Sequence, residues 1–149
     1  MFAYAVGLVG AMNTTVGAVP MAIFGFSLIV AGVFPPDPVR GYPPGALTEV
    51  RAGVTWQHRV HHIVGAPIAF LALWGSCLTI AGHLEGFWRL YTGLTAVAGL
   101  AFTIRTALAF QKDAAYTGLV QRGLILVYWS WIVLLAINLA IVQAPSMSM

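Results

Sequence analysis

The sequence predicts an all-α protein, a transmembrane bundle of about four helices that forms a single domain over residues 1–149. Of these residues 60% are hydrophobic and only 7% are charged, and the mean hydropathy is +0.88. Soluble domains carry roughly 25% charged residues, because water must solvate their surface. This chain has too few charges for such a surface, so its exterior is expected to face lipid.

Four apolar segments are candidates for crossing the hydrocarbon core, which requires roughly 20 apolar residues. The predicted spans are residues 16–34, 63–82, 88–108 and 123–142. In the third span the charge-free stretch before Arg105 is too short for the bilayer. Arg105 is therefore expected either to reach the interface with its long side chain or to find a partner inside the bundle.

Residues 1–15 are apolar but too short for a span, and two interpretations remain open. They extend the first span into one long tilted helix that is kinked at Pro20, or they are the remainder of an earlier helix. In both cases they are expected to belong to the mature chain, because the positively charged start of a signal peptide is absent.

The basic residues predict how the bundle is oriented. Segments 35–62 and 105–122 lie on the same side of a four-span bundle, and the other side holds only Arg89. The basic residues of the first side are Arg40, Arg51, Arg59, Arg105, Lys112 and Arg122. Because basic loops stay in the cytoplasm, the two segments are predicted to be cytoplasmic and the C-terminus to lie outside, in a multi-pass protein of the inner (plasma) membrane.

The net charge of +3 does not indicate a nucleic-acid partner. The basic residues stand singly at the ends of apolar segments, whereas a nucleic-acid site gathers them in a patch or groove. The expected partners are membrane lipids and other membrane protein subunits.

One polar cluster has residues that are suited to chemistry. Five prolines stiffen segment 34–57, and three histidines follow at the start of the next helix. On that helix His58 and His62 share a face one turn apart, a spacing that suits two ligands of one metal ion. His61 lies beside them.

A carboxylate from the connection would complete a metal site, with Asp37 and Glu49 as the candidates. Such a site would bind Zn²⁺ and activate water, although the glutamate of a zincin motif between the histidines is absent. Alternatively, the histidines anchor the connection through hydrogen bonds. A third interpretation is contact of basic groups with anionic lipid or another anion, for which Arg105 and Arg122 are candidates. No catalytic residue is assigned, and no cofactor is predicted.

Sequence motifs on both sides of this cluster support a family resemblance. They are Gly-Val-Phe-Pro-Pro-Asp-Pro at 32–38, Gly-Tyr-Pro-Pro-Gly at 41–45, His58 or His61 at the next helix, and the segment 118–131 with Arg122 near its start and Trp131 at its end. Over about residues 20–142 the chain resembles the bacterial integral membrane family known as domain of unknown function 998. The resemblance implies about six spans, of which this chain corresponds to the C-terminal four. It also implies a polar loop beside a histidine, but no activity.

The sequence favours a protein without a catalytic site, namely an accessory or structural subunit of a larger membrane complex of respiratory or photosynthetic type. Small residues recur at packing intervals on the helices, and Tyr128, Trp129 and Trp131 lie inside the last span, where they are expected to pack in the bundle or on a partner. The alternatives are a metal- or lipid-dependent membrane enzyme and a lipid-binding protein that uses the Asp/His cluster.

Overall fold

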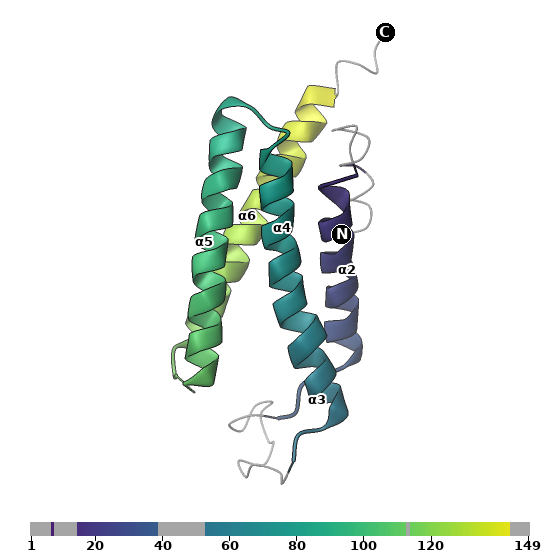
Figure 1. Cartoon of the computed structure of the whole chain (residues 1–149), viewed down its shortest axis with the longest axis vertical. Helices are drawn as coiled ribbons and strands as arrows, with labels where there is room; N and C mark the ends of the chain where they lie inside the picture. The colour runs from purple at the N-terminus through teal and green to yellow at the C-terminus, as the bar shows by residue number, and fades with distance from the viewer. Residues whose placement is uncertain (1–6, 8–14, 39–52, 113, 144–149) are drawn as a thin grey trace.

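The computed structural model of the protein describes residues 7, 15–38, 53–112 and 114–143. Over these residues the regular secondary structure is helical, without strands, and it comprises α2 (Ala18–Val33), α3 (Trp56–Val60), η1 (His61–Ile68), α4 (Ala69–Ala81), α5 (Gly86–Gln111) and α6 (Thr117–Gln143). Because α3, η1 and α4 follow one another without a break, they form one continuous rod, and the described chain folds into four helices (Figure 1). The predicted fold class, an all-α membrane bundle of about four helices, is confirmed.

Three of the four helices are long and apolar enough to cross a membrane. They are the rod Trp56–Ala81 with 26 residues, α5 with 26 residues and the segment Thr117–Ile141 of α6 with 25 residues. The fourth helix, α2, has 16 residues. At about 1.5 Å per residue it extends about 24 Å, which is less than the hydrocarbon core of about 30 Å.

Helix α2 begins at Ala18 and is not kinked by its proline. Pro20 stands in the first turn, where backbone N–H groups have no partner within the helix, so its missing N–H leaves no hydrogen bond unmade. The two interpretations of residues 1–15 fall almost entirely outside the described residues.

Neighbouring helices pack in the order of the chain: α2 on the rod, the rod on α5, and α5 on α6. Figure 1 shows that α6 runs obliquely behind the other helices, so that its middle crosses the bundle. The end of α2, the start of the rod, and the turn between α5 and α6 all lie at the lower end in this view. We call it the histidine end, because His58, His61 and His62 lie there.

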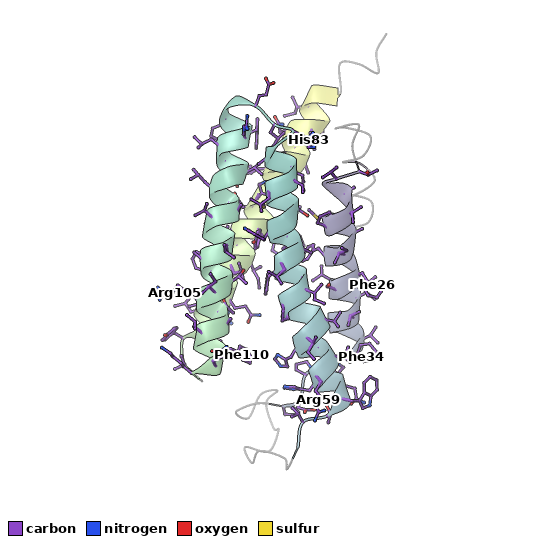
Figure 2. The ribbon with its side chains drawn as sticks, in the orientation of Figure 1. Phe26, Phe34, Arg59, His83, Arg105 and Phe110 are labelled. Carbon is purple, nitrogen blue, oxygen red and sulfur yellow. The ribbon has the colours of Figure 1, made fainter. Side chains whose placement is uncertain are left out.

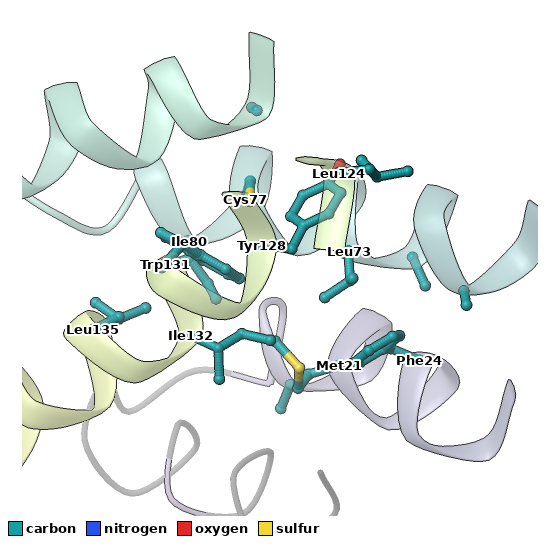
Figure 3. Packing of buried hydrophobic residues seen from close by; sticks show 14 residues of the cluster. Met21, Phe24, Leu73, Cys77, Ile80, Leu124, Tyr128, Trp131, Ile132 and Leu135 are labelled. Atoms are coloured by element: carbon teal, nitrogen blue, oxygen red, sulfur yellow. The ribbon is translucent and has the colours of Figure 1, made fainter. Parts of the chain in front are cut away.

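The core forms where α6 crosses the other helices (Figure 3). Tyr128 and Trp131 of α6 are fully buried in it, so these two aromatics pack within the bundle. The indole Nε1 of Trp131 donates a hydrogen bond of 3.1 Å to the hydroxyl of Thr92 on α5. A Cβ at Gly99 would overlap the Tyr128 ring, so α5 and α6 can approach this closely only because a glycine stands there.

Candidate functional site

Asp37, in the segment after α2, is hydrogen-bonded to Thr55 at the start of the rod. Its two carboxylate oxygens accept hydrogen bonds from Thr55, Oδ2 from the backbone N–H at 2.9 Å and Oδ1 from the hydroxyl at 2.6 Å. The Thr55 hydroxyl oxygen in turn accepts the backbone N–H of His58 at 3.2 Å, which makes Thr55 the N-cap of α3. Asp37 was predicted from the sequence as a site residue and Thr55 was not, although a threonine before a helix start is a recognisable N-cap signal.

His58 takes part in the same network through its ring. The backbone N–H of Asp37 donates to Nδ1 of His58 at 3.0 Å, and the same nitrogen lies 3.7 Å from Oδ2 of Asp37. In a neutral imidazole that accepts through Nδ1, the proton resides on Nε2. Residues 37 and 58, which are 21 positions apart in the chain, are therefore in direct contact, as the candidate site required.

His61, at the start of η1, is hydrogen-bonded to the end of α2. Its Nδ1 lies 2.9 Å from the backbone oxygen of Phe34 and 3.2 Å from that of Ala31. Because carbonyl oxygens only accept, Nδ1 carries the proton and donates to both. The last carbonyls of a helix lack partners within it, so His61 satisfies groups that would otherwise be unpaired beside the membrane. A Cβ at Gly65 would stand 3.1 Å from Cβ of Ala31, and this glycine therefore permits the close approach.

The rod departs from α-helical geometry where it meets α2. The segment η1 is a π-helix that starts at His61 and contains Pro67. Proline has no N–H to donate to the preceding turn, and π-helical turns recur at functional sites of proteins. His61 and Gly65, which contact the last turn of α2, both lie in this π-helical segment.

His62 completes a compact group of three histidine rings. Its ring centroid lies 4.1 Å from that of His58 and 5.5 Å from that of His61. On the other side it stands 5.4 Å from the ring of Phe110, near the end of α5. Figure 2 shows Phe34, Arg59 and Phe110 at this end of the bundle, with His83 at the opposite end.

The described residues do not supply a complete zinc site. His58 and His62 are adjacent, as their spacing indicated, but no group of three or more His, Cys, Asp or Glu side chains that could hold a metal ion occurs in the part of the chain that the structure describes. Both Asp37 oxygens already accept hydrogen bonds from Thr55. Glu49, the other candidate carboxylate, lies outside the described residues. The geometry of Asp37, His58 and His61 is that of a loop anchor.

Arg105 on α5 and Arg122 on α6, the candidates for anion or lipid contact, are both exposed. No ion pair of either guanidinium is found among the described residues. Arg105 therefore projects outward from the bundle, toward the surroundings in Figure 2, instead of finding a partner inside.

A partly enclosed cavity of about 220 Å³, which no sequence motif indicates, lies between α2, the rod and α6. Its walls are mainly apolar and include Phe24 of α2, Leu73 of α4 and Ile132 of α6. His61 and Gln121, both from the histidine end, also line it. It lies beside the stretch of α6 that crosses obliquely behind the other helices in Figure 1.

The comparisons with known proteins give one match. A family model described as "Protein of unknown function (DUF998)" matches residues 1–138. No curated protein and no solved structure matches the chain. The matched range starts earlier than the predicted resemblance over about residues 20–142, and it includes the histidine end and every residue that lines the cavity. The chain therefore belongs to the DUF998 family, a family of proteins of unknown function.

Proposed function

We propose that this protein binds an amphiphile within the bilayer, in the cavity between α2, the rod and α6, and does not transform it. The observation that carries the proposal is the cavity itself, which is apolar along most of its wall and has polar side chains, His61 and Gln121, at the histidine end. Small-molecule sites are typically concave and mostly apolar, with a few polar groups that fix the orientation of the ligand. Sites of this kind usually have volumes of roughly 300–1,000 Å³, so a cavity of about 220 Å³ favours a single chain.

The length of the cavity matches one leaflet of a bilayer. On α6 its lining extends from Gln121 to Ile132, which is about 16 Å at a rise of about 1.5 Å per residue. Half of the hydrocarbon core measures about 15 Å. An amphiphile with its head beside Gln121 would therefore keep its chain within the leaflet on the histidine side.

The lining favours binding over catalysis. Among the described residues that line the cavity there is no Ser, Cys, Asp, Glu, Lys or Arg. His61, which does line it, donates Nδ1–H to the end of α2, and the described lining offers it neither a Ser or Cys nucleophile nor a carboxylate.

Trp129 provides the test, because it lines the cavity while its side chain is 42% exposed. Bromine quenches indole fluorescence on contact, so a chain-brominated single-chain amphiphile should quench purified protein in detergent until the cavity is filled. The saturable part of the quenching should disappear in Trp129→Phe. It should persist in Trp56→Phe, a matched loss of a tryptophan on α3 that does not line the cavity. Identical quenching in wild type and Trp129→Phe would overturn the proposal.

We further propose that the protein spans the inner membrane of the cell and that its histidine end faces the cytoplasm. Six of the seven basic residues lie in segments 35–62 and 105–122. The helix ends adjoining both segments lie at the same end of the bundle in Figure 1. An excess of Lys and Arg in short loops on one side is the usual determinant of membrane orientation.

A second candidate role, an accessory subunit that packs against other membrane proteins, is favoured by α2. This helix is shorter than the hydrocarbon core, and large apolar side chains face outward along it, with Phe26 56% and Val33 63% exposed. Short membrane helices are accommodated by a thinner bilayer or by association with further helices. Extraction in mild detergent followed by native mass measurement should then give complexes with other subunits of a respiratory or photosynthetic type of assembly. A lone monomer would contradict this role.

A further inference from the structure

We infer that the cavity selects amphiphiles whose head is a neutral hydroxyl, that is, long-chain alcohols and their monoacylglycerol analogues, over ethers and carboxylic acids of the same length. This inference rests on the proposed amphiphile binding and names its ligand class. It depends on the hydrogen-bonding state of the two polar residues at the histidine end of the cavity, His61 and Gln121.

His61 has one ring nitrogen committed and one left for a ligand. Its Nδ1–H donates to the backbone oxygens of Phe34 and Ala31, and in a neutral ring these bonds fix the tautomer. The remaining nitrogen, Nε2, then carries a lone pair and accepts. Since His61 lines the cavity, the group that best satisfies Nε2 there is a hydrogen-bond donor.

Gln121 supplies the complementary groups. Its side chain is half-buried and lines the cavity, and no hydrogen bond of its amide is found within the residues that the structure describes. An amide offers two N–H donors and one acceptor oxygen. A hydroxyl is the smallest group that donates to Nε2 of His61 and at the same time accepts from an amide N–H. An ether oxygen accepts but cannot donate, so it leaves Nε2 without a partner.

The charges around the cavity disfavour an acid. No cationic side chain lines it in the described structure, and Arg122, the neighbour of Gln121, is exposed and lies outside the lining. A carboxylate would have to leave water without a counter-charge, which is costly. Against a neutral His61 it would also place its acceptor oxygens next to the lone pair of Nε2.

The experiment measures displacement of the brominated probe from the full-length protein in detergent by hexadecan-1-ol, hexadecyl methyl ether and hexadecanoic acid. The alcohol should compete about tenfold more strongly than the ether, the factor that one lost hydrogen bond of about 1.4 kcal/mol produces. The acid should compete more weakly than the alcohol. Monooleoylglycerol, tested in a parallel series, shows whether the cavity prefers the hydroxyl of a glycerolipid or that of a simple alcohol. Tighter binding of either compound than of the ether supports the inference.

Two variants separate the roles of His61 and Gln121. In His61→Asn the side-chain amide can still donate to the Phe34 carbonyl, so the thermal unfolding temperature should be retained. Asparagine has no counterpart of Nε2, and the preference for the alcohol over the ether should therefore fall to less than about threefold. Gln121→Leu should weaken the binding of the alcohol and of the ether by similar factors, because both oxygens accept from its amide N–H. The comparison of the ligands on the wild-type protein keeps the inference testable if His61→Asn fails to fold. Gln111→Leu, an exposed glutamine of α5 outside the cavity, should retain the full preference.

The outcomes separate this inference from the proposal beneath it. If the probe quenches Trp129 but the alcohol and the ether compete equally, or the acid competes best, the hydroxyl inference is overturned and amphiphile binding stands. If the probe produces no saturable quenching of Trp129, both are overturned.

Discussion

Thr55 donates two hydrogen bonds to the Asp37 carboxylate, one from its backbone N–H at 2.9 Å and one from its hydroxyl at 2.6 Å. The same hydroxyl oxygen accepts the backbone N–H of His58 and thereby caps the rod. Because residues 37 and 55 stand on either side of the long connection, this pair fixes the position at which the chain re-enters the bundle.

We expect Asp37→Ala to lower the free energy of unfolding by about 1–3 kcal/mol, because the Thr55 donors lose a charged acceptor and become partly buried without partners. Asp37→Asn keeps one acceptor oxygen and should cost less. The measurement is reversible unfolding in mixed micelles with increasing sodium dodecyl sulfate. Thr55→Ser, which preserves the hydroxyl, is the matched control for Thr55→Val, which removes it. Equal stability of wild type and Asp37→Ala would contradict the anchoring role.

Gly99 is a second position where one small change should have a large effect. A methyl group there would overlap the Tyr128 ring, and because this fully buried ring lies where α5 and α6 meet, the ring or the helices must shift to admit the methyl group. We expect Gly99→Ala to destabilise the protein by about 1–3 kcal/mol, the usual cost of overpacking. The same substitution at Gly93, where a Cβ meets nothing within 4 Å, should be neutral or stabilising. Thermal unfolding of the two variants in detergent measures the difference, and equal losses would show that the overlap is relieved.

The sequence predicts the helical membrane bundle well because hydropathy reports the surrounding solvent directly. It also predicts the adjacency of His58 and His62, since the i, i+4 spacing places two side chains on one helix face whatever the tertiary structure is. The contact of Asp37 with His58 was expected only in outline. Its partner Thr55 was overlooked, although the N-cap preference of threonine identifies it.

The cavity could not be predicted from the sequence. It depends on the angle at which α6 crosses the bundle, and that angle is set by contacts between residues far apart in the chain, such as Gly99 with Tyr128. Gln121 reads as an ordinary polar residue near a helix start until the crossing brings it to the same cavity as His61. The π-helical turn that begins at His61 likewise has no sequence signal beyond Pro67.

The hydrogen bond from Trp131 to Thr92 joins α6 to α5 over 39 positions of sequence. Both residues are fully buried, so removal of either partner leaves a polar group unsatisfied. We expect Trp131→Phe and Thr92→Val each to destabilise the bundle, and the double variant to lose about 1 kcal/mol less than the sum of the single losses. Unfolding free energies of the four proteins give this coupling. Strict additivity would mean that the bond contributes nothing to stability.

The two ends of α5 provide a matched pair for testing orientation. Glu85 precedes this helix and Gln111 ends it, and both side chains are exposed. Substituting either residue by cysteine leaves every basic residue in place. If the histidine end is cytoplasmic, a membrane-impermeant maleimide added to intact cells should label Glu85→Cys and leave Gln111→Cys unlabelled until the membrane is permeabilised. The only native cysteine, Cys77, is fully buried in the core, so the wild-type chain should remain unlabelled and serve as the control. Labelling of Gln111→Cys in intact cells, with Glu85→Cys protected, would reverse the proposed orientation and place the His61 end of the cavity in the outer leaflet.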